Sequence, residues 1–297
     1  MPQPFSNLFL KMRAKIKALA AAVTLATGVA AAAGEPAPER PVLSAFTAEA
    51  GSARITETYL SPIGYSGSVF GLGYERMQAM KFNPDRWVMR MHSRISAEFT
   101  HNPVHNASMQ AVGFDFGWGM MWRTRPAEKW TVTAGGSTGV NVGAIYNARN
   151  SNNPVAAKAS WTVNATAGAV FNTSLLRVPV CLRYIAELPL TGIFFSPAYG
   201  ELYYEIYLGN RSGLVRGAWP GNFFRLDNLL TADFRFNRTI LRLGYRCGVH
   251  SSEASHIVTR RITHTFVLGV ASEWLALGTS SSDRQRLREA RIISSLY

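Results

Sequence analysis

The stretch FRLDNLLTADFRFNRTILRLGYRC, Phe224 to Cys247, decides the fold. In its first half every second residue is apolar except Asn228, and the residues between them are mostly charged or polar. A period of two predicts a β-strand with unlike faces. The alternation restarts after Asn237-Arg238. The two runs therefore predict a hairpin with a turn at Asn237-Arg238, in which Asp233 faces Arg242 on the polar side.

The same period of two recurs along most of the chain. Trp87 to Phe99 shows it as clearly, and a strand of this length, rising about 3.3 Å per residue at a tilt of about 45°, places its aromatic ends roughly 28 Å apart along a membrane normal. That spacing matches aromatic belts on the two sides of a hydrocarbon layer. Besides the hairpin, we expect strands at Ala50–Leu60, Ser66–Met80, Trp87–Phe99, Ser108–Arg123, Trp130–Tyr146, Ala156–Asn172, Leu176–Phe194 and Ile257–Trp274.

Alternation alone does not separate a membrane barrel from a soluble sandwich or barrel, in which the apolar face points inward. Several runs are much longer than the average soluble strand of about 5 to 6 residues. Their polar face carries Gly, Ser, Thr, Asn and charges of both signs, as expected of a filled lumen. Long connections, such as Phe195–Asn222 and Val249–His256, also alternate with short ones.

These features predict an all-β, transmembrane, antiparallel up-and-down β-barrel. We expect about 10 strands, or about 12 if the first segment and the long connection each add pairing, with short turns in the periplasm and long loops outside.

The N-terminus has the three parts of a secretory signal peptide. A basic region precedes an apolar run from Ala18 to Ala33, and the run ends in a small-residue cleavage site, Ala31-Ala32-Ala33. The run is short for a transmembrane helix, which needs about 20 apolar residues. We expect residues 1–33 to be a signal peptide, 34–50 a flexible lead, 51–275 the barrel and 276–297 a C-terminal tail.

The formal net charge of +13 raises the question of a nucleic-acid partner. The arginines are spread along one face of the predicted strands, and no basic helix or base-stacking module is evident. We therefore expect no nucleic-acid partner. The expected partners are membrane lipid and the outer-membrane assembly machinery, and the sequence identifies no extracellular ligand.

Four segments carry a more specific signal: TYLSPIGYSG (Thr58–Gly67), LPLTGIFFSPAYGELYYEIYLGN (Leu188–Asn210), LLTADFRFNRTILRLGYR (Leu229–Arg246) and HTFVLGV (His264–Val270). Together they resemble the domain of unknown function 3316 family. The resemblance implies an uncharacterised protein exported to the outer membrane of a Gram-negative bacterium, and it brings no catalytic or binding residues. Family members tend to stop on an aromatic residue after the last strand, whereas this chain continues. Either Trp274 or Tyr297 is expected to supply the signal that the assembly machinery reads.

Charged residues on the polar face form the candidate site. Buried charges must be paired when they lose water, so we expect an ionic network in a largely filled lumen. The predicted network comprises Glu75, Arg90, His92, Arg94, Glu98, Asp115, Arg123, Arg183, Glu187, Arg225, Asp227, Asp233, Arg242 and Arg246. Lys158, Arg177 and Arg235 share this face, so basic groups outnumber acidic ones. A narrow, anion-preferring path is the alternative use of the lumen.

A hydrolase with a Ser/His site at the extracellular rim is the alternative function. The predicted outer loops contain His101, His105, His250 and His256, the last two beside Ser251, Ser252 and Glu253. A nucleophile needs a base within hydrogen-bond reach and a third group that orients the base. The loops offer these residue types without fixed positions, so we name no catalytic residue, cofactor or metal. We predict a non-enzymatic barrel with a structural, adhesive or narrow transport role.

Overall fold

The computed structural model describes residues 38–150, 153–197, 208–209, 213–236, 239–275 and 291–296. The predicted signal peptide, the turn Asn237-Arg238 and most of the predicted tail lie outside these residues. Within them, no helix is long and apolar enough to cross a membrane. The strands are β1 (Val42–Glu57), β2 (Ser61–Ala79), β3 (Trp87–His101), β4 (Ser108–Ala127), β5 (Trp130–Asn147), β6 (Val155–Leu175), β7 (Val178–Phe195), β8 (Val215–Ala218), β9 (Phe223–Phe236), β10 (Thr239–Ala254) and β11 (Ile257–Trp274).

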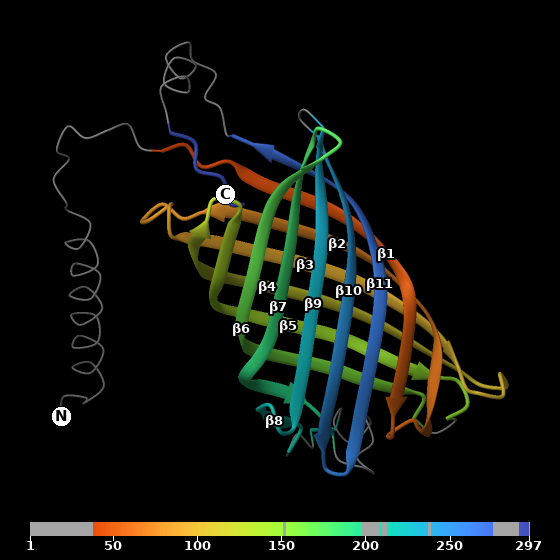
Figure 1. Cartoon of the computed structure of the whole chain (residues 1–297). Coiled ribbons are helices and arrows are strands. Elements are labelled where there is room, and N and C mark those ends of the chain that lie inside the picture. The colour runs from red at the N-terminus through yellow and green to blue at the C-terminus, as the bar shows by residue number, and fades with distance from the viewer. Residues whose placement is uncertain are drawn as a thin grey trace, which may run out of the picture. The chain divides into compact units, whose positions relative to one another are not determined.

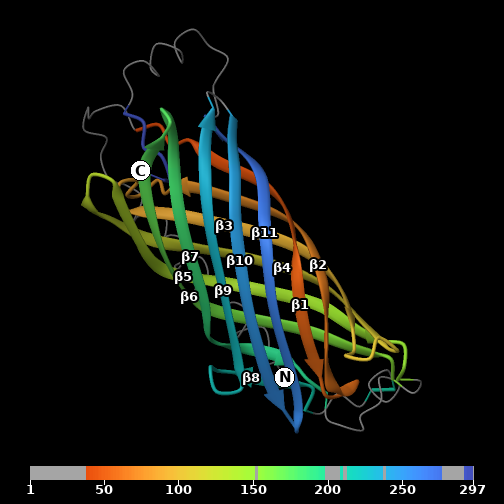
Figure 2. The same ribbon diagram turned by 45° about the vertical axis from the view of Figure 1, so that its right-hand side comes forward.

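The strands form one closed antiparallel barrel, as the sequence predicts. Each strand pairs with its neighbours in the order β6-β5-β4-β3-β2-β1-β11-β10-β9-β7, and β6 pairs with β7 to complete the circle. The described part of the wall thus contains ten strands, while the short β8 pairs only with the end of β7. Figure 1 shows β7, β9, β10, β11 and β1 side by side, with β3 to β6 behind them, and the turned view in Figure 2 agrees.

The two ends of the barrel differ, and we name them by the strands that meet there. At the near end β1 begins and β11 ends; β8 lies at the opposite, far end (Figures 1 and 2). The connections at the near end, after β2, β4, β6 and β9, are residues 80–86, 128–129, 176–177 and 237–238. The long connection between β7 and β9 lies at the far end.

The apolar face of each strand points outward. Phe46, Leu72 and Phe266 are 67%, 67% and 77% exposed, whereas arginines of the opposite parity such as Arg242 are 1% exposed. A soluble barrel or sandwich would show the reverse, so this burial pattern rules it out. The residues of the hairpin obey the same rule, and Asp233 pairs across the strands with Arg242, as predicted.

Aromatic side chains gather on the outer surface near each end of the wall. Near-end positions with exposed rings include Trp122, Trp130, Phe236 and Trp274; far-end positions include Phe99, Tyr146 and Trp161. Aromatic girdles of this kind flank the apolar band of outer-membrane barrels, because their rings suit the boundary between hydrocarbon and water.

Three predicted boundaries are wrong. The first strand begins at Val42 instead of Ala50, so residues 42–50 belong to the wall and not to a flexible lead. Residues Val249 to Ala254, predicted as loop, continue β10, and a turn at Ser255-His256 leads into β11. Residues 61–67, predicted to close the first strand, likewise begin β2. The strands at the far end are therefore longer than the sequence pattern indicates.

An apolar layer fills the lumen at the near end. It comprises Leu43, Ala45, Met77, Val88, Met121, Val170, Cys181, Ile240, Ala271 and Leu296. All but the last come from strands of the wall, whereas Leu296 comes from the C-terminal segment and is 0% exposed. The side chains of the wall and of this segment thus meet across the barrel and form an apolar floor.

Residues 291–296 are fixed in the near end by backbone hydrogen bonds. Glu39 donates its N–H to the carbonyl of Arg291 and accepts from the N–H of Ile293, both at 2.9 Å. Arg123 donates to the carbonyl oxygens of Ser294 (2.6 Å) and Pro84 (2.7 Å). The C-terminal segment is thereby tied both to the chain before β1 and to the turn between β2 and β3.

Candidate functional site

The lumen above the apolar floor contains a network of buried ion pairs with Glu75 at its centre. Glu75 accepts hydrogen bonds from Arg90 (2.8 Å), Arg183 (2.5 Å) and Arg242 (2.7 Å). Arg242 also donates two hydrogen bonds of 2.7 Å to Asp233. Parallel hydrogen bonds of this kind are stronger and more directional than single ones. One carboxylate on β2 therefore joins β3, β7 and β10 across the barrel.

A second group of charges lies next to this cluster, towards the far end. Glu49 on β1 pairs with Arg94 on β3 (2.8 Å) and with Arg246 on β10 (3.1 Å). Arg246 in turn contacts Asp227 on β9 at 2.5 Å. Arg90 of the first group also pairs with Glu187 on β7, at 3.3 Å. These contacts fill the middle of the lumen with paired charges, as buried ions require.

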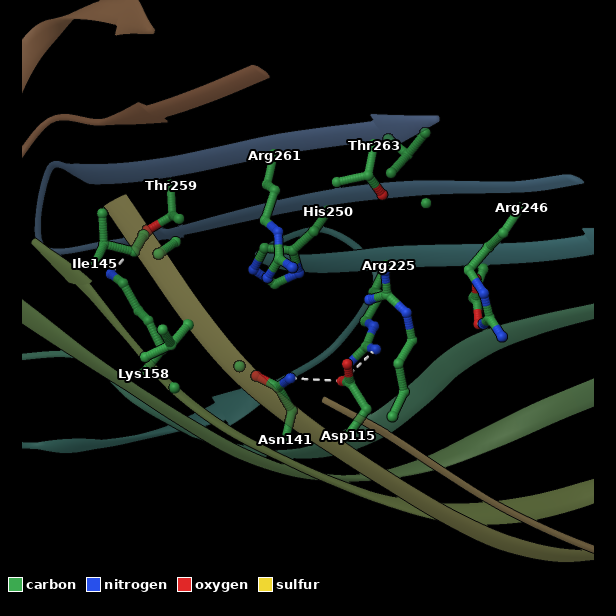
Figure 3. Close-up of a pocket in the computed structure, with 18 of the residues that line it drawn as sticks. Asp115, Asn141, Ile145, Lys158, Arg225, Arg246, His250, Thr259, Arg261 and Thr263 are labelled. Atoms are coloured by element: carbon green, nitrogen blue, oxygen red, sulfur yellow. Dashed lines mark hydrogen bonds and ion pairs between the residues drawn. The ribbon is translucent and has the colours of Figure 1, made fainter. Parts of the chain in front are cut away.

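A cavity of about 80 Å³ lies in the lumen towards the far end. Figure 3 shows Arg225, His250 and Arg261 reaching into the same space from the strands of one wall, with Asp115 and Asn141 opposite them. Arg225 donates to Asp115 at 2.5 Å, and Asn141 donates to the same oxygen atom at 2.6 Å. Further lining groups include Arg94, Lys158, Asp227 and Arg246.

Two more ion pairs border this cavity. Lys158 on β6 contacts Glu57 on β1 at 2.7 Å, and Arg261 on β11 forms an ion pair with Glu98 on β3. Apolar clusters flank the cavity at the far end, one around Ile55 and Met109 and one around Phe223. The cavity is therefore a polar space between a charged interior and an apolar rim.

The fourteen predicted network residues all lie on the inner face of the wall, and the structure brings most of them into contact. Arg123 is different, because its partners are backbone carbonyl groups at the near end and not carboxylates. His92 lines the cavity. Arg177, which was counted with the lumen charges, lies instead in the exposed turn between β6 and β7 with φ of 69°.

Sequence reasoning missed four charged residues of the network. Glu49 and Glu57 are on β1, Arg261 is on β11, and Glu273 pairs with Arg235 at 3.4 Å. All four occupy the inward parity of their strands, so the parity rule finds them once the strand boundaries are known. With these residues, positive and negative charges nearly balance. The added carboxylates thus largely offset the expected excess of basic groups, on which the anion-preferring path rested.

Two of the four histidines of the alternative hydrolase site, His101 and His250, lie in strands and not in the predicted outer loops. His250 belongs to β10 and lines the cavity, where its ring contacts Phe223 at a centroid distance of 5.0 Å. His101 ends β3, while His105 and His256 are in turns. No hydrogen bond between a serine and a histidine is present in the parts of the chain that the structure describes. Those parts also contain no group of three or more His, Cys, Asp or Glu side chains placed to hold a metal ion.

The closed wall, the outward apolar face and the filled polar lumen define an outer-membrane type of β-barrel. Within this class, the model of the family "Protein of unknown function (DUF3316)" matches residues 16–280, and the chain belongs to that family. The resemblance seen in the four sequence segments is thus confirmed. No curated protein matches the chain.

Solved structures with a similar architecture are remote in sequence. The outer membrane protease OmpT from Escherichia coli is 3% identical with a TM-score of 0.42, covering 79% of this chain and 97% of its own. The translocator domain of the autotransporter NalP from Neisseria meningitidis is 10% identical with a TM-score of 0.34, covering 91% and 98%. A Pseudomonas aeruginosa FadL homologue is 7% identical with a TM-score of 0.30, covering 80% and 90%. At these values the likeness carries no information about activity.

Proposed function

We propose that this protein is a non-conducting, non-enzymatic barrel with a structural or adhesive role in the outer membrane of a Gram-negative bacterium. The N-terminal signal peptide would export it, the near end would face the periplasm and the far end the outside. Membrane lipid would cover the apolar outer face, and the outer-membrane assembly machinery would insert the strands. The short near-end connections after β4, β6 and β9 support this orientation, because outer-membrane barrels have short turns on the periplasmic side.

The observation that carries the proposal is the closed floor of the lumen. The apolar layer contains Leu43, Val88 and Leu296, which are all 0% exposed. An ion entering such a layer loses its water without gaining polar partners, which is costly. The ionic cluster around Glu75 stands directly above this floor, where its arginines are occupied by carboxylates. Of the predicted roles, a filled lumen favours a structural or adhesive one over transport.

A hydrolase receives no comparable support. The candidate serine nearest to His250 in sequence on the inner face is Ser252, and its neighbourhood lacks the hydrogen-bonded base and orienting acid that acyl transfer needs. We therefore retain the non-enzymatic role and no second function.

Conductance measured in a planar lipid bilayer tests the proposal. The purified full-length barrel is expected to give no stepwise current at any holding voltage that the bilayer tolerates. A general porin inserted from the same detergent is the positive control for insertion. Regular single-channel steps from this protein would overturn the proposal. Fractionation of cell membranes with heat-dependent gel mobility tests the location separately, and a folded, heat-modifiable band in the outer-membrane fraction is expected.

A further inference from the structure

Three ion pairs beside the far-end cavity share one orientation. The side chains of Lys158, Arg225 and Arg261 are 24%, 31% and 24% exposed, whereas their partners Glu57, Asp115 and Glu98 are 0%, 10% and 1% exposed. Each carboxylate is thus buried behind its cation. In the inner cluster no such difference exists, because Arg183 and Arg242 are both 1% exposed. The fourth pair at the cavity, Arg246 with Asp227, has the opposite order, with side chains 11% and 23% exposed. The lining as a whole nevertheless contains five Arg and Lys side chains and two carboxylates, so cations predominate at the cavity surface.

These cations retain hydrogen-bond donors that no described residue uses. A guanidinium group has five N–H donors. Arg225 uses one nitrogen, Nη2, to reach Asp115, and Arg261 uses Nη2 to reach Ser96 and Glu98. Both carboxylates of the lining already accept hydrogen bonds: Asp115 accepts from Arg225 and Asn141 through Oδ1, and Asp227 accepts from Arg246 through Oδ2. The five Arg and Lys side chains of the lining therefore carry more N–H donors than its two carboxylates can accept.

The donors converge from different strands. Arg225 extends from β9, Arg261 from β11 and Lys158 from β6, and Figure 3 shows the first two beside His250 above Asp115 and Asn141. Because each cation is anchored by its own carboxylate, binding a ligand requires little further ordering of side chains. Preorganisation of this kind increases affinity.

We propose that the far-end cavity binds a small oxyanion, either a free anion or the carboxylate or phosphate group of a molecule that arrives from outside. Such a ligand supplies only acceptors, which complements the surplus of N–H donors and matches a space of about 80 Å³. Arg225 and Arg261 would donate to its oxygen atoms, with Lys158 adding a third positive charge. A ligand can reach this site from the far end alone, so the proposal does not depend on whether the floor is closed.

Calorimetric titration of the full-length barrel in detergent tests the proposal, with inorganic phosphate and acetate as the probes. Acetamide, the uncharged counterpart of acetate, is the ligand control. We expect saturable binding of at least one anion and none of acetamide. Arg225→Gln and Arg261→Gln should each weaken binding about tenfold to a hundredfold, as expected for loss of a hydrogen bond from a charged donor.

Arg260→Gln is the matched protein control. Arg260 is the neighbour of Arg261 on β11, but it is exposed on the opposite, outer face. The Arg260→Gln variant should bind as the unchanged protein does. Equal weakening in the Arg260 and Arg261 variants would show a general charge effect and overturn the proposal. Absence of binding of both anions at millimolar concentration and low ionic strength would overturn it as well.

Gly113→Ala provides a test that keeps every charge. A Cβ at Gly113 would lie 3.5 Å from Oγ of Ser96 and 3.9 Å from Nη1 of Arg261, which are ordinary contacts. The methyl group would therefore enter the cavity without displacing the wall. Weaker anion binding with unchanged heat-dependent gel mobility supports the site, whereas unchanged binding contradicts it even if an arginine variant fails to fold.

Discussion

Replacing Glu75 by Gln tests whether the lumen network stabilises the barrel through charge pairing. The change keeps the size of the side chain but removes its negative charge. Arg90 and Arg242 then retain Glu187 at 3.3 Å and Asp233 at 2.7 Å, respectively. Within the described residues, Arg183 forms an ion pair with Glu75 and with no other carboxylate, and its side chain is 1% exposed. The substitution therefore leaves Arg183 as a buried charge without a carboxylate.

Removing one partner of a buried ion pair costs about 3–5 kcal/mol. We expect Glu75→Gln to lower the free energy of unfolding by about this amount. The exposed pair of Asp85 and Arg291, whose side chains are 46% and 70% exposed, is the comparison. Asp85→Asn should cost less than about 1 kcal/mol, because solvent screens a surface pair.

Urea unfolding in detergent or lipid vesicles, followed by tryptophan fluorescence, measures both variants. A double-mutant cycle with Arg183→Met separates charge pairing from packing. Because the double variant removes the stranded charge and keeps an apolar side chain, we expect it to recover more than half of the stability lost by Glu75→Gln. A loss below about 1 kcal/mol in Glu75→Gln, or no recovery in the double variant, would refute this account of the lumen.

Three further predictions concern the wall and the floor. Phe266→Arg, at an outer position midway along β11, should lower the free energy of unfolding in lipid by about 2–4 kcal/mol. Leu176→Arg, in the exposed near-end turn, should lower it little. Equal losses of stability in urea titrations would contradict the outward apolar face. Gly51→Ala should lower the free energy of unfolding by about 1–3 kcal/mol, because its Cβ would lie 1.9 Å from the carbonyl oxygen of His264 on β11. Gly136→Ala is the control and should have little effect, because the nearest atom to its Cβ would be 3.7 Å away. Similar unfolding midpoints for the two variants would argue against the close contact at Gly51. Leu296→Asp should release residues 291–296 from the floor, and unchanged hydrogen exchange in that C-terminal peptide would count against the packing seen here.

The sequence predicts the wall well where one face meets lipid. In the hairpin of β9 and β10, large apolar residues such as Phe234 and Leu243 alternate with charges, so parity and register both follow from the pattern. The prediction fails where this contrast is weak. In β1 the outward residues around Ala48 are small, and at the far end of β10 both faces are polar around Ser252. A strand that extends beyond the hydrocarbon layer has water available on its outer face, so alternation no longer marks it.

The lumen is predictable as a set of residues but not as a set of contacts. Parity places Glu75 and Arg183 inside, yet they are 108 positions apart, and their contact depends on how the barrel closes. The distance between opposite walls follows from strand number and stagger, which the sequence pattern does not fix. The place of Leu296 in the apolar floor is harder still to predict, because no sequence periodicity connects a C-terminal segment with the lumen.

The contacts of Glu75 also bear on how the barrel forms. Its carboxylate holds arginines from β3, β7 and β10, and no single hairpin contains all of them. In a partly assembled barrel some of these guanidinium groups would lack their carboxylate partner and would need water as a hydrogen-bond acceptor. Such an intermediate could not exclude water from its interior. Water should accordingly leave the lumen when β1 and β11, the first and last strands, pair. Barrel closure is then a cooperative final step, and partly paired sheets obtain little of the stabilisation that the ion pairs provide.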